Sequence, residues 1–246
     1  MEWTDDAIVL SARKHGESAA IVHALTAAHG RHAGLVRGGT GRRQRGTLQA
    51  GNEVRLVWRG RLEEHLGHFT VELVAPRAAR WLDDAGRLGA LTAAAAVVEA
   101  ALPERENHPE IYADFRALLD ALDGDPAWIE AYVRWELALL ADLGFGLDLG
   151  HCAATGVTDD LVYVSPRSGR AVSAAAGAPY RDKLLPLPAF LAAGAAAPDP
   201  RDLAAGLSLT GYFLEHHVLE PHGGHLPPAR LRLVDRLSLS ATTSGI

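Results

Sequence analysis

The chain has 246 residues, 48% of them hydrophobic, with 24 Lys and Arg against 30 Asp and Glu. This length and composition provide apolar residues for one large domain or two ordinary ones. The only cysteine, Cys152, excludes an intramolecular disulfide. The N-terminal residues are acidic and lack the basic and apolar regions of a secretory signal, so we expect none. The apolar run 93–98 is far short of the ~20 residues that span a membrane. We therefore expect a soluble cytoplasmic protein.

Charge is divided unevenly along the chain. Residues 1–80 carry 12 basic and 8 acidic side chains, a balance of +4, which leaves a balance of −10 for the remainder. Much of the positive charge lies in the glycine-rich stretch 37–46, which contains four arginines. A flexible arginine loop of this kind is suited to a phosphate backbone, and the acidic remainder is not.

The first quarter of the chain reads as short strands. Apolar runs at 7–10, 19–25 and 32–36 are separated by turn residues. At 52–59 and 69–73 apolar and polar residues alternate, so Trp58 and Phe69 should lie on a core face and pack there rather than stack on bases. Five strands in about 75 residues predict a small barrel or sandwich, and five is the strand count of the OB-fold.

From about residue 81 the hydrophobic period becomes that of helices. Asn107 and Pro109 begin a helix with one apolar stripe, and Pro126 precedes a helix that is apolar on nearly all sides and ends at Gly144. Two further helices are expected near 203–214 and after Pro228. The segment between them, about 145–200, reads as irregular.

Several short motifs resemble the bacterial RecO family of DNA repair proteins, and their order and spacing extend over nearly the whole chain. They are Ala7-Ile8-Val9-Leu10, Glu17, His29-Gly30-Arg31, Val36-Arg37-Gly38, Leu48-Gln49-Ala50-Gly51, Trp58-Arg59-Gly60-Arg61, Leu66-Gly67-His68-Phe69-Thr70, Leu143-Gly144-Phe145, Cys152-Ala153-Ala154-Thr155-Gly156 and Tyr163-Val164-Ser165-Pro166-Arg167-Ser168-Gly169.

The resemblance implies an α+β chain: a five-stranded OB-fold barrel over residues 1–78, then an all-helical domain over 79–246 with an irregular zinc-finger-like insertion at 145–200. It implies a recombination mediator without a catalytic centre, associated with the nucleoid. Such a protein binds single- and double-stranded DNA, anneals complementary strands, and acts with RecR to load RecA. The DNA is coated by single-stranded DNA-binding protein (SSB), whose acidic tail the family recognises.

One departure from the family concerns zinc. Some members have two Cys-x-x-Cys pairs, and the matching positions here are Cys152, Thr155, Ser173 and Ala176. One thiolate remains of four, whereas structural zinc needs four N, S or carboxylate donors. We therefore expect no zinc and no other cofactor, and we expect the insertion to be held by packing of residues such as Leu161, Tyr163 and Val164.

The proposed DNA contacts are arginines, because glycines let a loop follow a backbone and guanidinium pairs bidentately with phosphate. The alternative is a solvated loop whose charge only aids solubility. A nucleotide-binding P-loop is disfavoured because the required lysine followed by Ser or Thr is missing. The predicted contacts are Arg31, Arg37, Arg42, Arg43, Arg45, Arg59 and Arg61.

Two other functions stay open at this point. One is a general single-strand-binding OB protein that has no annealing activity. The other is a metal-dependent hydrolase that uses the histidine-rich region 216–225, where His216 and Glu220 have the i, i+4 spacing of a helical ligand pair. Cys152 has no recognisable dyad partner. In the acidic part, pockets for protein tails could involve Arg116, Arg134 or Arg170.

Overall fold

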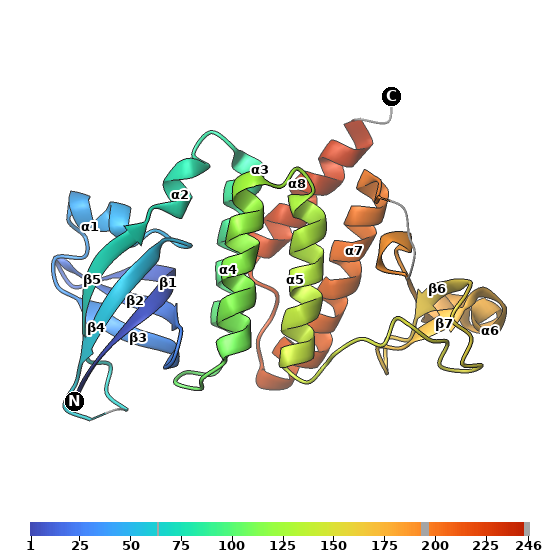
Figure 1. Cartoon of the computed structure of the whole chain (residues 1–246), viewed down its shortest axis with the longest axis horizontal. Coiled ribbons are helices and arrows are strands. Elements are labelled where there is room, and N and C mark those ends of the chain that lie inside the picture. The colour runs from blue at the N-terminus through green and yellow to red at the C-terminus, as the bar shows by residue number, and fades with distance from the viewer. Residues whose placement is uncertain (63, 193–196, 244–246) are drawn as a thin grey trace. The chain divides into compact units, whose positions relative to one another are not determined.

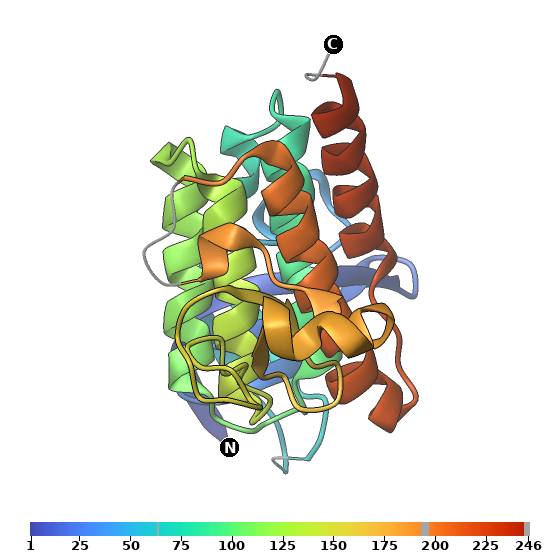
Figure 2. The same ribbon diagram turned by 90° about the vertical axis from the view of Figure 1, so that its right-hand side faces the viewer.

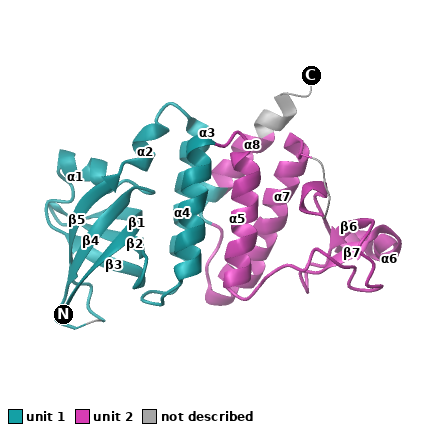
Figure 3. Ribbon diagram, in the orientation of Figure 1, with its two compact units in different colours: residues 1–124, 227–230 teal, residues 125–226, 231–246 magenta. Residues whose placement is uncertain are grey.

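The computed structural model describes residues 1–62, 64–192 and 197–243 (Figure 1). The chain divides into two compact units, which are coloured separately in Figure 3. Unit 1 contains Met1–Gly124 and Pro227–Arg230, and unit 2 contains Asp125–Leu226 and Leu231–Ile246. The compact unit that holds the first strands therefore continues to Gly124. The domain boundary expected at 78/79 stays a prediction.

Unit 1 contains a closed barrel of five strands in the order β1-β2-β3-β5-β4. All neighbours pair antiparallel except β3 and β5, which pair parallel through Leu35 and His68. This confirms the five-stranded OB-type fold predicted from the sequence. The strands are β1 (Glu2–His15), β2 (Ala19–Thr26), β3 (Gly30–Val36), β4 (Glu53–Arg59) and β5 (His68–Ala75).

The long first strand makes the closure possible. The first half of β1 pairs with β4 and its second half with β2, and the register shifts between Val9 and Ser11. A bulge of this kind bends a strand and increases its twist, as a small barrel requires. The apolar run at 7–10 therefore marks only the centre of a longer strand.

The barrel core follows the alternation in the sequence. Trp58 is fully buried and Phe69 is 4% exposed, while Arg55 and Arg59 on the opposite face are exposed. This confirms that Trp58 and Phe69 pack in the core.

Three helices follow the barrel in unit 1: α2 (Arg77–Arg80), α3 (Ala85–Ala101) and α4 (Pro109–Gly124). The Asp84 carboxylate caps α3 by accepting hydrogen bonds from the amides of Gly86 and Arg87. Helix α3 packs against β1. The apolar stripe predicted for α4 is buried, with Ile111, Phe115, Leu118, Leu119 and Leu122 inside.

Unit 2 is built around α5 (Trp128–Asp142) and α7 (Pro200–Phe213), which continues as a π-helix over Leu214–Leu219. The capping box at the start of α7 uses Asp199 and Asp202. The final helix, α8 (Pro228–Thr243), begins in unit 1 and continues in unit 2. Within α5, Glu136 is fully buried among the apolar residues, and its carboxylate accepts a hydrogen bond from Thr210 Oγ1 on α7 at 2.5 Å.

The segment 145–200 is more regular than the sequence indicated. It contains a three-stranded sheet in the order β7-β6-β8, formed by β6 (Leu161–Val164), β7 (Ala171–Ser173) and β8 (Leu185–Pro186), with α6 (Ala174–Gly177) next to it (Figure 2). These strands have two to four residues, too few to show a period. Positions 193–196 of the segment lie outside the described residues. In the described part of the chain, every helix is too short or too polar to cross a bilayer.

Candidate nucleic-acid interface

The candidate interface begins at the tight turn that follows β3. Gly38 adopts a φ of +67°, which favours glycine, and a Cβ on Gly39 would lie 2.7 Å from the Cβ of Ala20. The Thr40 amide and hydroxyl both donate to the carbonyl oxygen of Ser18, each at 3.1 Å. The turn is therefore fixed to the hairpin that joins β1 and β2.

The arginines after this turn form a short helix, α1 (Arg42–Thr47). Its residues are exposed or half-buried, and the next residue, Leu48, is buried in the barrel core. Arg45 Nε donates to the carbonyl oxygen of Thr40 at 2.7 Å. The stretch was expected to be a flexible loop. It is ordered because arginine and glutamine favour helix and because Leu48 anchors its end.

We call Arg37, Arg42, Arg43 and Arg45 the arginine surface. All four side chains are exposed, and none makes an ion pair with a described residue. Like charges three residues apart on a helix repel each other, as Arg42 and Arg45 do here. A polyanion would relieve that repulsion.

A groove of about 410 Å³ lies beside the arginine surface, where β3 and β5 close the barrel. The polar residues that line it are Arg37, Gln44, Arg59, His68 and Thr70. Sequence reasoning did not single out Gln44, His68 or Thr70 as site residues. The alternation of β5 had already placed His68 and Thr70 on the outer face, but only the fold brings them beside α1.

The remaining predicted contacts are placed differently. Arg61 is exposed in the loop between β4 and β5 and has no ion-pair partner among the residues that the structure describes. Arg59 is exposed and hydrogen-bonded to Glu2 at 2.9 Å, a contact that lowers the pKa of Glu2. Arg31 is 14% exposed, and its Nε donates to the carbonyl oxygen of Leu102 at 2.8 Å. The placement of Arg31 favours a structural role over a DNA contact.

The basic side chains of residues 1–80 divide into those that make ion pairs and those that do not. Half of its 12 basic side chains make ion pairs with carboxylates, namely Arg13, Arg31, Arg55, Arg59, Arg77 and Arg80. The other half are exposed and lack such a partner in the described ranges, namely Lys14, Arg37, Arg42, Arg43, Arg45 and Arg61. Most of the unpaired cations thus belong to the arginine surface or to the loop between β4 and β5.

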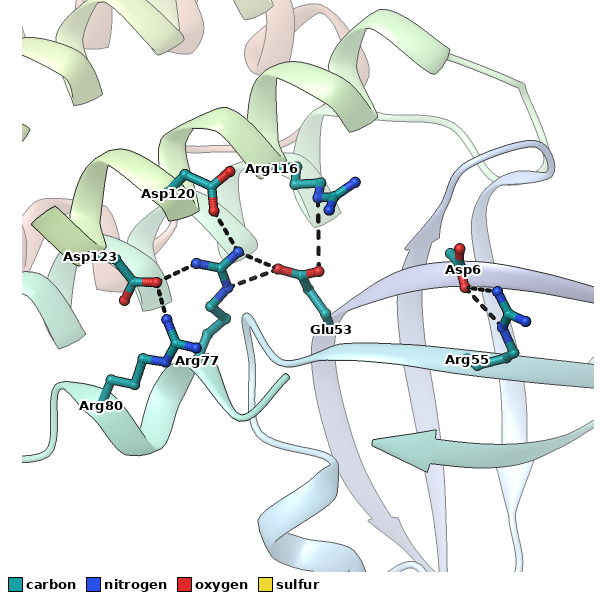
Figure 4. Close-up of polar contacts among 8 residues, drawn as sticks. All are labelled: Asp6, Glu53, Arg55, Arg77, Arg80, Arg116, Asp120 and Asp123. Atoms are coloured by element: carbon teal, nitrogen blue, oxygen red, sulfur yellow. Dashed lines mark hydrogen bonds and ion pairs between the residues drawn. The ribbon is translucent and has the colours of Figure 1, made fainter. Parts of the chain in front are cut away.

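Figure 4 shows the largest of the paired groups. Arg77 lies between Glu53 of β4 and two aspartates of α4, Asp120 and Asp123. Arg80 also contacts Asp123. These arginines join the barrel to α4 within unit 1, so they are structural.

The zinc-finger-like insertion brings three of its four matching positions together, because the side chains of Thr155 and Ser173 both hydrogen-bond with Cys152. Cys152 Sγ lies 3.4 Å from Ser173 Oγ, and the Ser173 amide donates to the same sulfur at 3.3 Å. Cys152 is 1% exposed. Leu161 and Val164 are buried and Tyr163 is half-buried, in keeping with the packing that was expected to hold this segment. Three neutral groups and one thiol are a poor donor set for zinc.

The histidine-rich region forms two ion pairs. His216 Nδ1 lies 2.7 Å from a Glu220 oxygen, and His225 Nδ1 lies 2.9 Å from a Glu215 oxygen. Burial would raise the pKa of Glu215, but hydrogen bonds from His225 and the Leu226 amide lower it. The ligating atoms of Glu215, Glu220 and His225 are within 4.8 Å of one another. Because these carboxylates already have partners, the arrangement is explained by structural ion pairs.

The three arginines considered for protein tails also have partners. Arg116 lies 3.8 Å from Glu53, and Arg170 lies 3.4 Å from Asp148. Arg134 pairs with Glu130 and donates to the carbonyl oxygen of Phe190 at 3.0 Å.

Comparisons with known proteins agree with this architecture. Residues 1–77 match the family model described as recombination protein O N terminal, and residues 82–226 match the model described as recombination protein O C terminal. The chain is 55% identical to the DNA repair protein RecO of Rhodospirillum centenum, covering 100% of this chain and 98% of that one. It is 54% identical to RecO of Rhodospirillum rubrum, covering 96% of each chain, and 51% identical to RecO of Caulobacter vibrioides, covering 97% and 98%. The chain therefore belongs to the recombination protein O (RecO) family.

Proposed function

We propose that this chain binds single- and double-stranded DNA through the arginine surface and acts as a recombination mediator in DNA repair. One observation carries the proposal: Arg37, Arg42 and Arg43 are exposed cations without carboxylate partners in the described structure, gathered by one turn and one short helix. Arg37 and Arg59 also line the groove at the β3–β5 seam. We add Arg59 and Arg61 as further DNA contacts outside the arginine surface and leave Arg31 out.

The mechanism is electrostatic. Each phosphate neutralised by a guanidinium releases condensed counterions, so affinity falls as salt rises and depends little on base sequence. Two complementary strands repel each other in solution. Bringing both onto one basic surface screens that repulsion, and this is a sufficient physical account of strand annealing.

The proposed partners follow from family membership. We propose that the chain acts with RecR to load RecA onto single strands coated by SSB, and that unit 2 receives the acidic SSB tail. The action takes place in the cytoplasm at the nucleoid and needs no catalytic centre or cofactor. Support comes from relatives named DNA repair protein RecO that align over nearly the whole chain.

The test is a charge reversal in the full-length protein, Arg42→Glu with Arg43→Glu and Arg45→Glu. We expect DNA binding and annealing of complementary oligonucleotides to fall severely. The thermal midpoint should stay nearly unchanged, because these side chains are exposed. The matched control reverses Arg167, Arg181 and Arg201, which lie in unit 2 and are also exposed. Unaltered DNA affinity in the first variant would refute the role of the arginine surface.

The same annealing assay distinguishes the recombination mediator from the alternative function. A wild-type protein that binds single strands but does not accelerate annealing would be a general single-strand-binding OB protein.

A further inference from the structure

A second hollow in unit 1 has a different chemistry from the arginine surface. It has a volume of about 400 Å³ and lies between the start of β1, the β2–β3 loop and the end of β4. Trp3, His29, His32, Trp58 and Arg105 line it, and we call it the aromatic pocket. Pockets of this size, with flat apolar walls and a few polar groups, are typical ligand sites.

Stacked rings form its wall. The imidazole of His29 lies on the indole of Trp3, with ring centroids 4.1 Å apart and planes within 8°. The ring of Trp58 stacks on Trp3 from 5.8 Å. Trp3 therefore already accepts a flat heteroaromatic ring. That ring is 36% exposed, and among the described residues its hydrogen-bond partner is Asp5, at 2.9 Å. A ligand ring that takes its place keeps the stacking on Trp3 and costs the hydrogen bond to Asp5, whose carboxylate still accepts from the Ala28 amide.

His32 supplies an unpaired polar group. Its side chain is 4% exposed, and neither ring nitrogen has a hydrogen-bond partner among the described protein groups. A neutral imidazole offers one N–H donor and one nitrogen acceptor. Buried polar groups without partners are rare in folded proteins, so the two ring nitrogens of His32 need a hydrogen-bonding partner, and a ligand in the pocket is one that can supply it.

The charges around the pocket favour a neutral ring that carries phosphates outside it. Glu2 and Arg105 both line the pocket and have opposite charges, so their side chains together favour neither an anion nor a cation inside it. Arg59 pairs with the Glu2 carboxylate, and Arg61 follows two residues later on the exposed loop. A strand whose phosphates contact Arg61 could place one base within reach of Trp3.

We propose that the aromatic pocket receives one unstacked nucleobase of a single strand, stacked on Trp3 with its edge hydrogen-bonded to His32. This inference rests on the proposed DNA binding and adds a contact to a base, which the arginine surface does not provide. Stacking on aromatic side chains tolerates every base, because each has a π-face. The pocket therefore gives preference for single strands without sequence specificity.

The test compares two labelled single strands of equal length, an oligothymidylate and an all-abasic strand. Both carry the same phosphates, so the arginine surface treats them alike. We expect the full-length protein to bind the oligothymidylate about tenfold more tightly at one salt concentration. Trp3→Ala should bring this ratio close to one, and His32→Phe, which keeps a ring of similar size, should reduce it to a few-fold.

The control is Tyr180→Ala, which removes an aromatic side chain that is 61% exposed in unit 2 and should leave the ratio unchanged. Thermal unfolding checks that each variant is folded, and His32→Phe gives the answer if Trp3→Ala does not fold. A wild-type ratio near one, with both strands bound, overturns the pocket and leaves the proposed function standing. So does a ratio that survives in both variants. If the wild type binds neither strand, the proposed function is overturned instead.

Discussion

The guanidinium of Arg77 lies 2.6 Å from the carboxylate of Glu53, and the two side chains are 9% and 12% exposed. Burial alone would lower the pKa of Arg77, but hydrogen bonds to Glu53 and Asp120 raise it far above its ordinary value. Arg77 therefore stays positively charged throughout the accessible pH range, and it joins Glu53 at the start of β4 to Asp120 and Asp123 of α4. Arg77, one of the 12 basic residues of 1–80, therefore stabilises the fold and is not free to contact DNA.

Replacing Arg77 with Met should destabilise the protein by about 3 kcal/mol, because Glu53 would remain buried without its main partner. Urea unfolding followed by circular dichroism measures the loss. The control is Arg55→Met, which breaks a pair with Asp6 whose two side chains are each 55% exposed. That variant should unfold at nearly the wild-type urea concentration. Equal losses in the two variants would show that burial of the Arg77 network is unimportant.

The close approach of Gly39 to Ala20 gives a prediction about the turn. Gly39→Ala should cost about 1–3 kcal/mol, because its Cβ would lie 2.7 Å from the Ala20 Cβ and 3.1 Å from the Val36 carbonyl oxygen. It should also weaken DNA binding by displacing the arginine surface.

Gly46→Ala is the matched control for this turn. A Cβ there meets nothing within 4 Å, and the residue lies in α1. Alanine should stabilise the protein by about 0.5–1 kcal/mol. Thermal unfolding of the two variants provides the comparison, and a Gly39→Ala protein as stable as wild type would contradict the account of the turn.

Acid sensitivity follows from His32. Burial, aided by Arg105, lowers the pKa of His32 to about 4 from its ordinary value of 6.5. Below pH 6.5 His32 therefore binds a proton in the unfolded chain but stays neutral in the folded protein until about pH 4. The free energy of unfolding falls as the pH falls through this range. This effect amounts to about 2 kcal/mol between pH 7.5 and pH 5.

His32→Phe removes that titration. Urea unfolding at the two pH values should show the variant losing about 2 kcal/mol less stability than the wild type over this interval. Equal losses in both proteins would show that His32 takes up its proton at an ordinary pKa in the folded state.

Much of the fold could be predicted from the sequence because the residues that define it repeat locally. The alternation around Trp58 and the stripe from Ile111 to Leu122 each specify an element and its buried face. The polar ends of β1 could not be predicted in the same way, because they become strand only by pairing with β2 and β4. The short strands β6 to β8 likewise form only by pairing with one another.

The candidate site was predictable only in part. Glycines and arginines at 37–46 identify a basic turn, since their chemistry is local. Which arginines remain unpaired depends on acceptors far along the chain. Arg31 contacts the carbonyl oxygen of Leu102 and the carboxylate of Glu104, and Arg77 contacts the carboxylates of Asp120 and Asp123. The aromatic pocket likewise joins Trp3 to Arg105 across most of unit 1, and no spacing in the sequence indicates that meeting.

The central claim is that unpaired guanidinium groups of the arginine surface carry DNA affinity. The most direct measurement is the salt dependence of single-strand binding by the wild type, by Arg42→Gln with Arg43→Gln, and by Arg13→Gln with Arg55→Gln as a control whose arginines are ion-paired. Losing two phosphate contacts should reduce the slope of log K against log salt by about 1.4 in the first variant and leave it unchanged in the control. An unchanged slope in the first variant, or an equal reduction in both, would contradict the account.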